Sequence, residues 1–211
     1  MKLYPVFLNI EDMLAVVVGG GDVASRKMKD LAGSGARIKI IAPELKSDIL
    51  EFADKNRNVV EIIQREYKNG DIDGANLVFS CTDNAELNRK IYMEAQEKSI
   101  PVNAVDDPEN CTFFVPSHTR RDDLLLAVST SGASPAMAAR LRRIFEKHIP
   151  ENISEILDSL RNARVLLQNK NDLPSRERGD ILKKIVNDDS LLLELIKNFK
   201  NGTIKEFLDS L

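Results

Sequence analysis

The sequence predicts an α/β fold: an N-terminal doubly wound parallel sheet of the Rossmann type, then a small α+β segment and a helical C-terminal domain. Three observations lead to it. The apolar run 14–18 ends in three consecutive glycines. Strand-like and helix-like segments then alternate as far as residue 105. From residue 151 onward, apolar residues recur at helical spacing.

The first βαβ unit spans residues 14–42. Residues 14–18 form a short β-branched run, which is typical of a strand buried on both faces. The glycines then open a helix expected over residues 22–34. Gly35 ends this helix, and residues 37–42 form the second strand.

The same alternation continues through the rest of the N-terminal region, which we expect to form one domain over residues 1–112. The predicted elements are a helix at 47–55, strands at 59–64 and 77–80, a helix at 84–97 and a strand at 100–105.

Residues 113–148 follow a different pattern. We expect strands at 112–116 and 124–129, joined by a charged turn at 120–123, and a helix that begins near Pro135. This segment is too small to bury a core alone, so it should pack on a neighbour or on a second copy of the chain.

Residues 149–211 are predicted to form a small helical bundle. Ile153, Ile156, Leu157 and Leu160 gather one apolar stripe of a helix. No motif in this region predicts a catalytic role.

Composition excludes several classes of protein. With 43% hydrophobic and 30% charged residues, the 211-residue chain resembles an ordinary globular protein. Its net charge of -3 argues against a nucleic-acid partner. No signal peptide or bilayer-spanning run is present, so we expect a cytoplasmic protein with no membrane partner. Cys81 and Cys111 match no metal-binding spacing, and we expect no resident metal.

The run Gly19-x-Gly21-x-x-Ala24 follows a predicted strand and opens a predicted helix, as a dinucleotide-binding loop does. Gly19 permits the tight turn, Gly21 leaves room for a pyrophosphate, and Ala24 lets helix and strand approach closely. The helix N-terminus then directs amide groups at the anion. The alternative is a sharp turn that binds nothing.

The residues at the end of the second predicted strand indicate which dinucleotide is bound. An acidic residue usually ends this strand and binds the adenosine ribose, but Ala42 and Pro43 stand there instead. Glu44 lies just beyond and could take that role, which would favour NAD over NADP by repelling a 2′-phosphate. Lys46 nearby weakens this inference.

Two further positions follow predicted strands at the same sheet edge. Thr82 and Asp83 come after the fourth strand and are candidate cofactor contacts; Asp83 could also, or instead, cap the next helix. After the fifth strand, Asn103 and Asp106 place an amide and a carboxylate where a base could reach substrate. Asp106 or Asp107 could equally start a turn before Pro108.

The run 129–135, Ser-Thr-Ser-Gly-Ala-Ser-Pro, offers hydroxyls and free amides at a helix start, and arginines including Arg140 follow it. This composition suits an anion. An N-cap followed by proline explains the same residues without a ligand, and the two interpretations are compatible.

Four motifs taken together resemble the siroheme synthase family, over about residues 4–148. They are Val-Gly-Gly-Gly-Asp-Val-Ala at 18–24, Asn-Ala-Val-Asp at 103–106, Phe-Phe-Val-Pro-Ser at 113–117 and Ala-Val-Ser-Thr-Ser-Gly-Ala-Ser-Pro at 127–135. Within that family the chain is most similar to the precorrin-2 dehydrogenases, some of which are also sirohydrochlorin ferrochelatases.

The resemblance implies NAD-dependent oxidation of precorrin-2 to sirohydrochlorin by a homodimer. Whether Fe²⁺ is also inserted into sirohydrochlorin stays open. By the same matching, the catalytic aspartate falls on Asp106. The implied dinucleotide contacts are Asp22, Val23, Pro43 and Glu44. The expected substrate contacts are Asn103, Thr130, Ser131, Gly132, Ser134 and Arg140.

Two alternatives remain at this point. Asp106 could position the substrate and not act as the base, since an ordinary carboxylate is a weak base at neutral pH. A non-catalytic NAD(H)-sensing regulator would explain the glycines and the helical tail, although not Asn103–Asp106.

Overall fold

The computed structural model describes residues 2–105, 107–170 and 173–211. Contacts within the chain divide it into two units, one ending at Val115 and one comprising Pro116–Leu211, and each is described by itself. The predicted boundary at 112 and the further division at 148 stay predictions.

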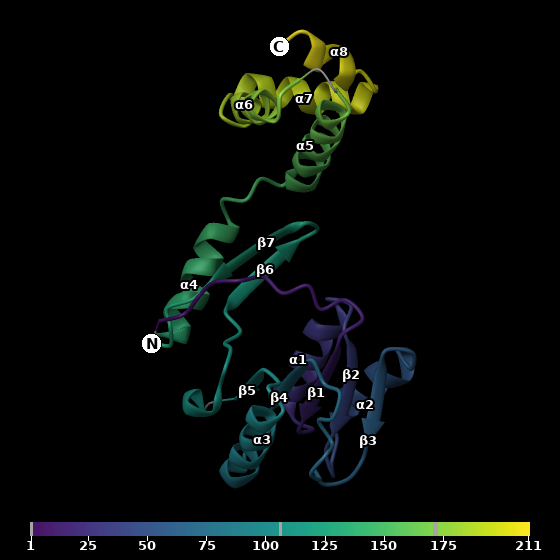
Figure 1. The fold of residues 1–211 in the computed structure, drawn as a ribbon, viewed down its shortest axis with the longest axis vertical. Helices are drawn as coiled ribbons and strands as arrows, with labels where there is room; N and C mark the ends of the chain where they lie inside the picture. Colours follow the sequence, from purple (N-terminus) through teal and green to yellow (C-terminus); the bar gives the residue numbers. More distant parts are fainter. Residues whose placement is uncertain (1, 106, 171–172) are drawn as a thin grey trace. The chain divides into compact units, whose positions relative to one another are not determined.

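A five-stranded parallel sheet forms the centre of the first unit (Figure 1). Its spatial order is β3-β2-β1-β4-β5. The strands are β1 (Leu14–Val18), β2 (Arg37–Ile41), β3 (Val60–Ile63), β4 (Leu77–Ser80) and β5 (Val102–Ala104). The strand order reverses direction between β1 and β4, and ligands of such sheets bind outside the carboxyl ends at that point. The predicted doubly wound fold is confirmed.

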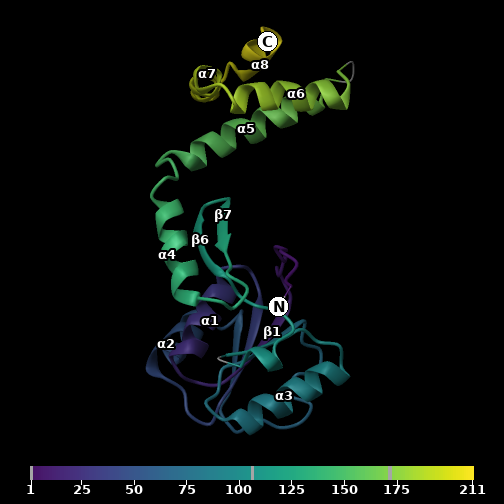
Figure 2. The ribbon, with the colours of Figure 1, turned by 90° about the vertical axis from the view of Figure 1, so that its left-hand side faces the viewer.

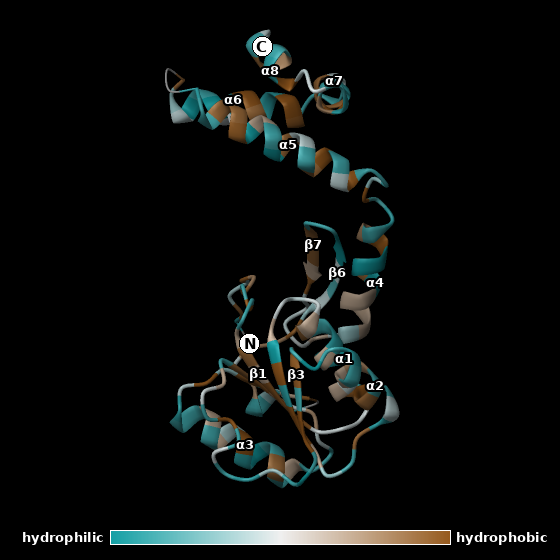
Figure 3. Cartoon of the chain, turned by 90° about the vertical axis from the view of Figure 1, so that its right-hand side faces the viewer, coloured by the Kyte–Doolittle hydropathy of each residue, from teal (hydrophilic) through white to brown (hydrophobic). Residues whose placement is uncertain are grey.

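Helices cover both faces of this sheet, with α1 (Asp22–Ala32) and α2 (Ser47–Lys55) on one face and α3 (Ala85–Glu97) on the other (Figure 3). Successive side chains of β1 point to opposite faces of the sheet, so this strand contributes to both layers of the core. Val17 packs in one core with Met28 and Ile49, whereas Val16 packs in the other with Ile91. A strand buried on both faces needs an uninterrupted apolar run, which β1 has.

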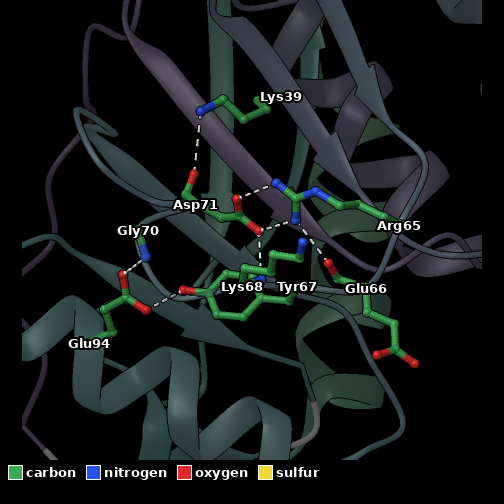
Figure 4. Close-up of polar contacts among 8 residues, drawn as sticks. All are labelled: Lys39, Arg65, Glu66, Tyr67, Lys68, Gly70, Asp71 and Glu94. Carbon is green, nitrogen blue, oxygen red and sulfur yellow. Dashed lines mark hydrogen bonds and ion pairs between the residues drawn. The ribbon is translucent and has the colours of Figure 1, made fainter.

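The connection from β3 to β4 contains no helix and is held by polar contacts (Figure 4). Tyr67 and Ile72 from this connection join the core beside α3. The side chain of Arg65 donates two hydrogen bonds to Asp71, both at 2.7 Å. The connection therefore covers its part of the sheet much as a crossover helix would.

The second unit begins with an antiparallel hairpin of β6 (Ser117–Arg121) and β7 (Leu124–Val128), followed by α4 (Pro135–Glu146). The strand expected at 112–116 is wrong. Thr112 instead bonds to β5 in the first unit, where its N–H donates to the Val102 carbonyl at 2.8 Å. The hairpin turn at Asp122 and Asp123 lies within the charged turn expected at 120–123, and Asp122 has a φ of 49°.

The last four helices form a small bundle, as expected (Figure 2). They are α5 (Ile153–Gln168), α6 (Ser175–Val186), α7 (Asp189–Asn201) and α8 (Ile204–Asp209). Ala163, Leu167, Ile185, Leu195 and Phe207 form its buried centre. Among the residues that the structure describes, no helix is both long enough and apolar enough to cross a membrane.

Candidate functional site

The glycine loop joins β1 to α1 and is shaped by its two neighbouring strands. Gly19 has a φ of 125°, and a Cβ there would lie 2.3 Å from the Cys81 carbonyl oxygen. A Cβ on Gly20 would lie 1.9 Å from the Glu44 carbonyl oxygen. Both positions therefore require glycine for the fold itself.

Gly21 differs from the two glycines before it. A Cβ there would meet no described atom within 4 Å, and its φ of -90° is open to any residue. Gly21 is the N-cap of α1 but supplies no side-chain cap, so the first amides of the helix have no partner within it. This is the open, donor-lined space that a pyrophosphate needs.

The loop between β2 and α2 lies against the glycine loop. The Lys46 N–H donates to the Gly20 carbonyl at 3.0 Å, and the Lys46 ammonium lies 2.6 Å from an Asp22 carboxylate oxygen. Pro43 and Glu44 are exposed on this loop. The structure thus brings Asp22, Pro43 and Glu44 together around the start of α1, with the charge of Lys46 already paired.

The end of β4 is fixed by a side chain that the sequence analysis did not single out. Buried Asn88 on α3 accepts hydrogen bonds from the hydroxyls of Ser80 and Thr82, both at 2.6 Å, and donates to the Thr82 carbonyl at 3.0 Å. Thr82 is thereby held at the carboxyl edge of the sheet. A polar residue on the buried face of a predicted helix was the signal that could have identified Asn88.

Asp83 is not the cap of α3. The N-cap is Asn84, whose side chain accepts from the Leu87 N–H at 3.0 Å, and Asp83 is exposed. Capping favours the residue whose carboxamide oxygen reaches the third amide of the helix, and the chain enters α3 one residue later than expected. Asp83 is left as a cofactor candidate without that structural role.

The segment after β5 is closed by Cys111. Its sulfur lies 3.2 Å from the Ala104 N–H nitrogen and 3.2 Å from the Asp107 carbonyl oxygen. Asn103 donates to the Phe113 carbonyl at 2.9 Å, so its amide nitrogen is engaged within the protein. Asp106 lies outside the described residues, and these contacts hold the residues on either side of it.

Asp107 has a local role. Its carboxylate accepts from the Asn110 amide at 2.6 Å across the short 3₁₀ turn Pro108–Asn110. This contact is the turn-starting role that the sequence left open for one of the two aspartates. Burial raises the pKa of the Cys111 thiol beside this turn.

In the second unit, the hydroxyl-rich run gathers at the start of α4. Ser134 is the N-cap, accepting from the Met137 N–H at 3.2 Å. The Thr130 hydroxyl accepts from the Ser134 N–H at 3.0 Å. Ser131 and Gly132 are exposed and have φ values of 53° and 88°. Arg140 is exposed farther along α4.

The described residues contain no group of three or more His, Cys, Asp or Glu side chains placed to hold a metal ion. Cys81 and Cys111 are free thiols. Burial raises the pKa of the Cys81 thiol to about 12, which keeps it protonated at neutral pH.

Comparison with known proteins gives two family matches. The model described as putative NAD(P)-binding matches residues 6–117, and the one described as sirohaem biosynthesis protein central matches residues 121–148.

Similar curated proteins are siroheme synthases. That of Methylobacillus flagellatus is 41% identical over 150 residues, which cover 71% of this chain and 32% of that protein. That of Pseudomonas paraeruginosa is 33% identical over 183 residues, covering 80% and 39%. The chain thus spans about a third of the length of these relatives.

A solved structure described as "SirC, precorrin-2 dehydrogenase" superposes with a TM-score of 0.77. The match covers 99% of this chain and 100% of that one at 23% sequence identity. At that identity the match shows a shared fold, which includes the sheet, the hairpin segment and the C-terminal helices.

Proposed function

Because this chain belongs to the family described as putative NAD(P)-binding and is similar to siroheme synthases, we propose that it oxidises precorrin-2 to sirohydrochlorin. One observation carries the proposal. The glycine loop follows β1, and Val105, the residue before Asp106, follows β5; because both strands are parallel members of one sheet, the two segments leave it at the same edge. A dinucleotide and a carboxylate are thereby available to one substrate.

The dinucleotide proposed is NAD. Its pyrophosphate would lie over Gly21 against the amides of Asp22 and Val23, with the adenosine ribose near Pro43 and Glu44. Lys46 is the nearby cation on this loop, and it is paired with Asp22 at 2.6 Å. Glu44 then gives this end of the site an acidic character, which repels a 2′-phosphate and favours NAD over NADP.

The nicotinamide end would lie toward β4 and β5. Thr82, held by Asn88, and exposed Asp83 are the proposed contacts there. NAD supplies the hydride acceptor when it is bound. The chain's own residues orient the cofactor and take up the proton.

Oxidation of precorrin-2 removes one hydride and one proton, so a base is required beside the acceptor. We assign the proton to the carboxylate of Asp106. Cys111 and Asn103 hold the described residues on either side of it. Asp107 is committed to the turn and is not assigned chemistry.

The carboxylates of the tetrapyrrole need donors. The hydroxyls and amides of Thr130, Ser131, Gly132 and Ser134 at the start of α4, with Arg140, have the required chemistry. We propose the amide oxygen of Asn103, which accepts no hydrogen bond from the described residues, as a further substrate contact. The donors at the start of α4 belong to the second unit, and Asn103 belongs to β5 of the first unit.

We also propose a homodimer. Met137, Ile144 and Phe145 expose apolar side chains on α4, in the segment whose core is too small to stand alone. A second copy of the chain would cover them.

The decisive experiment compares Asp106→Asn with Asp107→Asn. Asn keeps the size of aspartate and removes its basicity, so Asp106→Asn should bind NAD normally and lose about a hundredfold to ten-thousandfold of its NADH production from precorrin-2. Asp107→Asn should lose much less. Near wild-type turnover in Asp106→Asn would refute the assignment of the base.

Two further assays separate the alternatives. A protein that binds NAD but produces no NADH from precorrin-2 would be a sensor. Insertion of Fe²⁺ into purified sirohydrochlorin without NAD would show that the protein is also a chelatase. If no Fe²⁺ is inserted, the protein is a dehydrogenase only.

A further inference from the structure

Lys27 is a half-buried lysine on α1 whose charge has no carboxylate partner among the described residues. Its ammonium lies 5.6 Å from the centre of the Phe79 ring, and burial lowers its pKa. Lys29, two residues away on the same helix, lies 3.1 Å from Asp48. Removing an ammonium from water without an opposing carboxylate is costly, and a cation-π contact offsets only part of that cost.

The surroundings of Lys27 place it at the carboxyl edge of the sheet. Phe79 is one residue from the end of β4, and its ring packs edge-on against Phe113 at 5.3 Å between centroids. The Phe113 carbonyl is held by Asn103 of β5. Through Phe79, the ammonium lies beside the end of β4.

The backbone of Lys27 lies away from the end of α1 where a pyrophosphate would bind. Lys27 is six residues beyond the helix N-cap, which corresponds to about 9 Å along the axis. The helix N-terminus already supplies amide donors to a phosphate there. The carboxylates of a tetrapyrrole bound at the carboxyl edge of the sheet are the better match for a cation beside Phe79.

We propose that Lys27 forms an anion subsite that receives one carboxylate of the tetrapyrrole, a role that rests on the function proposed above. The Phe79 ring, whose centre lies 5.6 Å from the Lys27 ammonium, keeps water from one side of that ammonium, which strengthens its attraction for a carboxylate. The bound carboxylate would bring an opposite charge closer to the ammonium than any carboxylate of the described residues.

The test uses Lys27→Met, which keeps the length and apolar stem of lysine and removes its charge, and Lys27→Arg, which restores the charge. Sirohydrochlorin binding and NADH binding are titrated separately by fluorescence. Lys27→Met should weaken sirohydrochlorin binding about tenfold or more, as expected for loss of a charge-assisted hydrogen bond. NADH affinity should change less than about twofold, and Lys27→Arg should recover most of the loss.

Lys29→Met is the matched control on the same helix and should bind sirohydrochlorin as the wild type does. Unchanged sirohydrochlorin binding in Lys27→Met would overturn the proposal. A variant that loses affinity for NADH alone would also overturn it, because the ammonium would then bind the cofactor phosphate. If Lys27→Met does not fold, Lys27→Gln is used in the same titrations. Failure of the wild type to bind either ligand would instead refute the proposed function.

Discussion

The Tyr67 hydroxyl donates a 2.7 Å hydrogen bond to the carboxylate of Glu94, an acid whose side chain is only 4% exposed (Figure 4). The other oxygen of Glu94 accepts from the Gly70 N–H at 2.8 Å. These two contacts fasten the helix-free connection between β3 and β4 to α3. A buried carboxylate is tolerated there because both of its oxygens have donors.

Replacing Tyr67 with Phe should destabilise the protein. The variant keeps the ring in the core but leaves one oxygen of Glu94 without its donor, so the free energy of unfolding should fall by about 1.5–3 kcal/mol in urea titrations. Tyr4→Phe is the control, because Tyr4 is 87% exposed. Equal stability of the two variants would show that the Tyr67 contact contributes nothing.

Acid should weaken this region through Asp71. Hydrogen bonds from Arg65 hold the pKa of the Asp71 carboxyl below its ordinary value. A carboxyl with a lower pKa in the folded state stabilises the fold above its unfolded pKa, about 4, and loses that contribution as the pH falls through the folded pKa. Asp71→Asn should therefore be less stable at neutral pH and show a shallower decline below about pH 4.

Urea unfolding measured at several pH values checks the prediction, with Glu51→Gln on the exposed side of α2 as the control. A parallel pH profile for Asp71→Asn and the wild type would contradict it.

Substitutions at Gly20 and Gly21 should affect different properties, the first the stability of the fold and the second the binding of NADH. Gly20→Ala places a Cβ 1.9 Å from the Glu44 carbonyl, so it should lower the thermal stability strongly. Gly21→Val fills open space and should stay folded while losing NADH binding, because its side chain occupies the place proposed for the pyrophosphate. Thermal melting and NADH titration of both variants test this. Wild-type NADH affinity in folded Gly21→Val would remove the loop from the cofactor site.

The dimer prediction concerns α4. Phe145 has 48% of its surface exposed, and Phe145→Glu places a charge where a second copy is proposed to pack. Sedimentation should show a dimer for the wild type and a shift toward monomer for the variant. Lys147→Glu, just beyond the helix, serves as the control. A wild-type chain that is a stable monomer at micromolar concentration would refute the dimer.

The sequence by itself determined the sheet and the glycine loop. Both depend on local patterns: the apolar run of β1 has to be buried on two faces, and a strand-to-helix turn at Gly19 needs a positive φ. The N-cap at Ser134 followed by proline is equally local, and it was predicted.

Only the tertiary structure decided which side chains support these local features. Asn88 reaches Thr82 because α3 packs on β4, and Lys27 meets Phe79 because α1 packs on β1, the neighbour of β4 in the sheet. The position of β6 was missed for the same reason, since Thr112 finds its partner in β5 and not in a hairpin. Such contacts join residues that the sequence does not place together, so their energies depend on packing that no local pattern specifies.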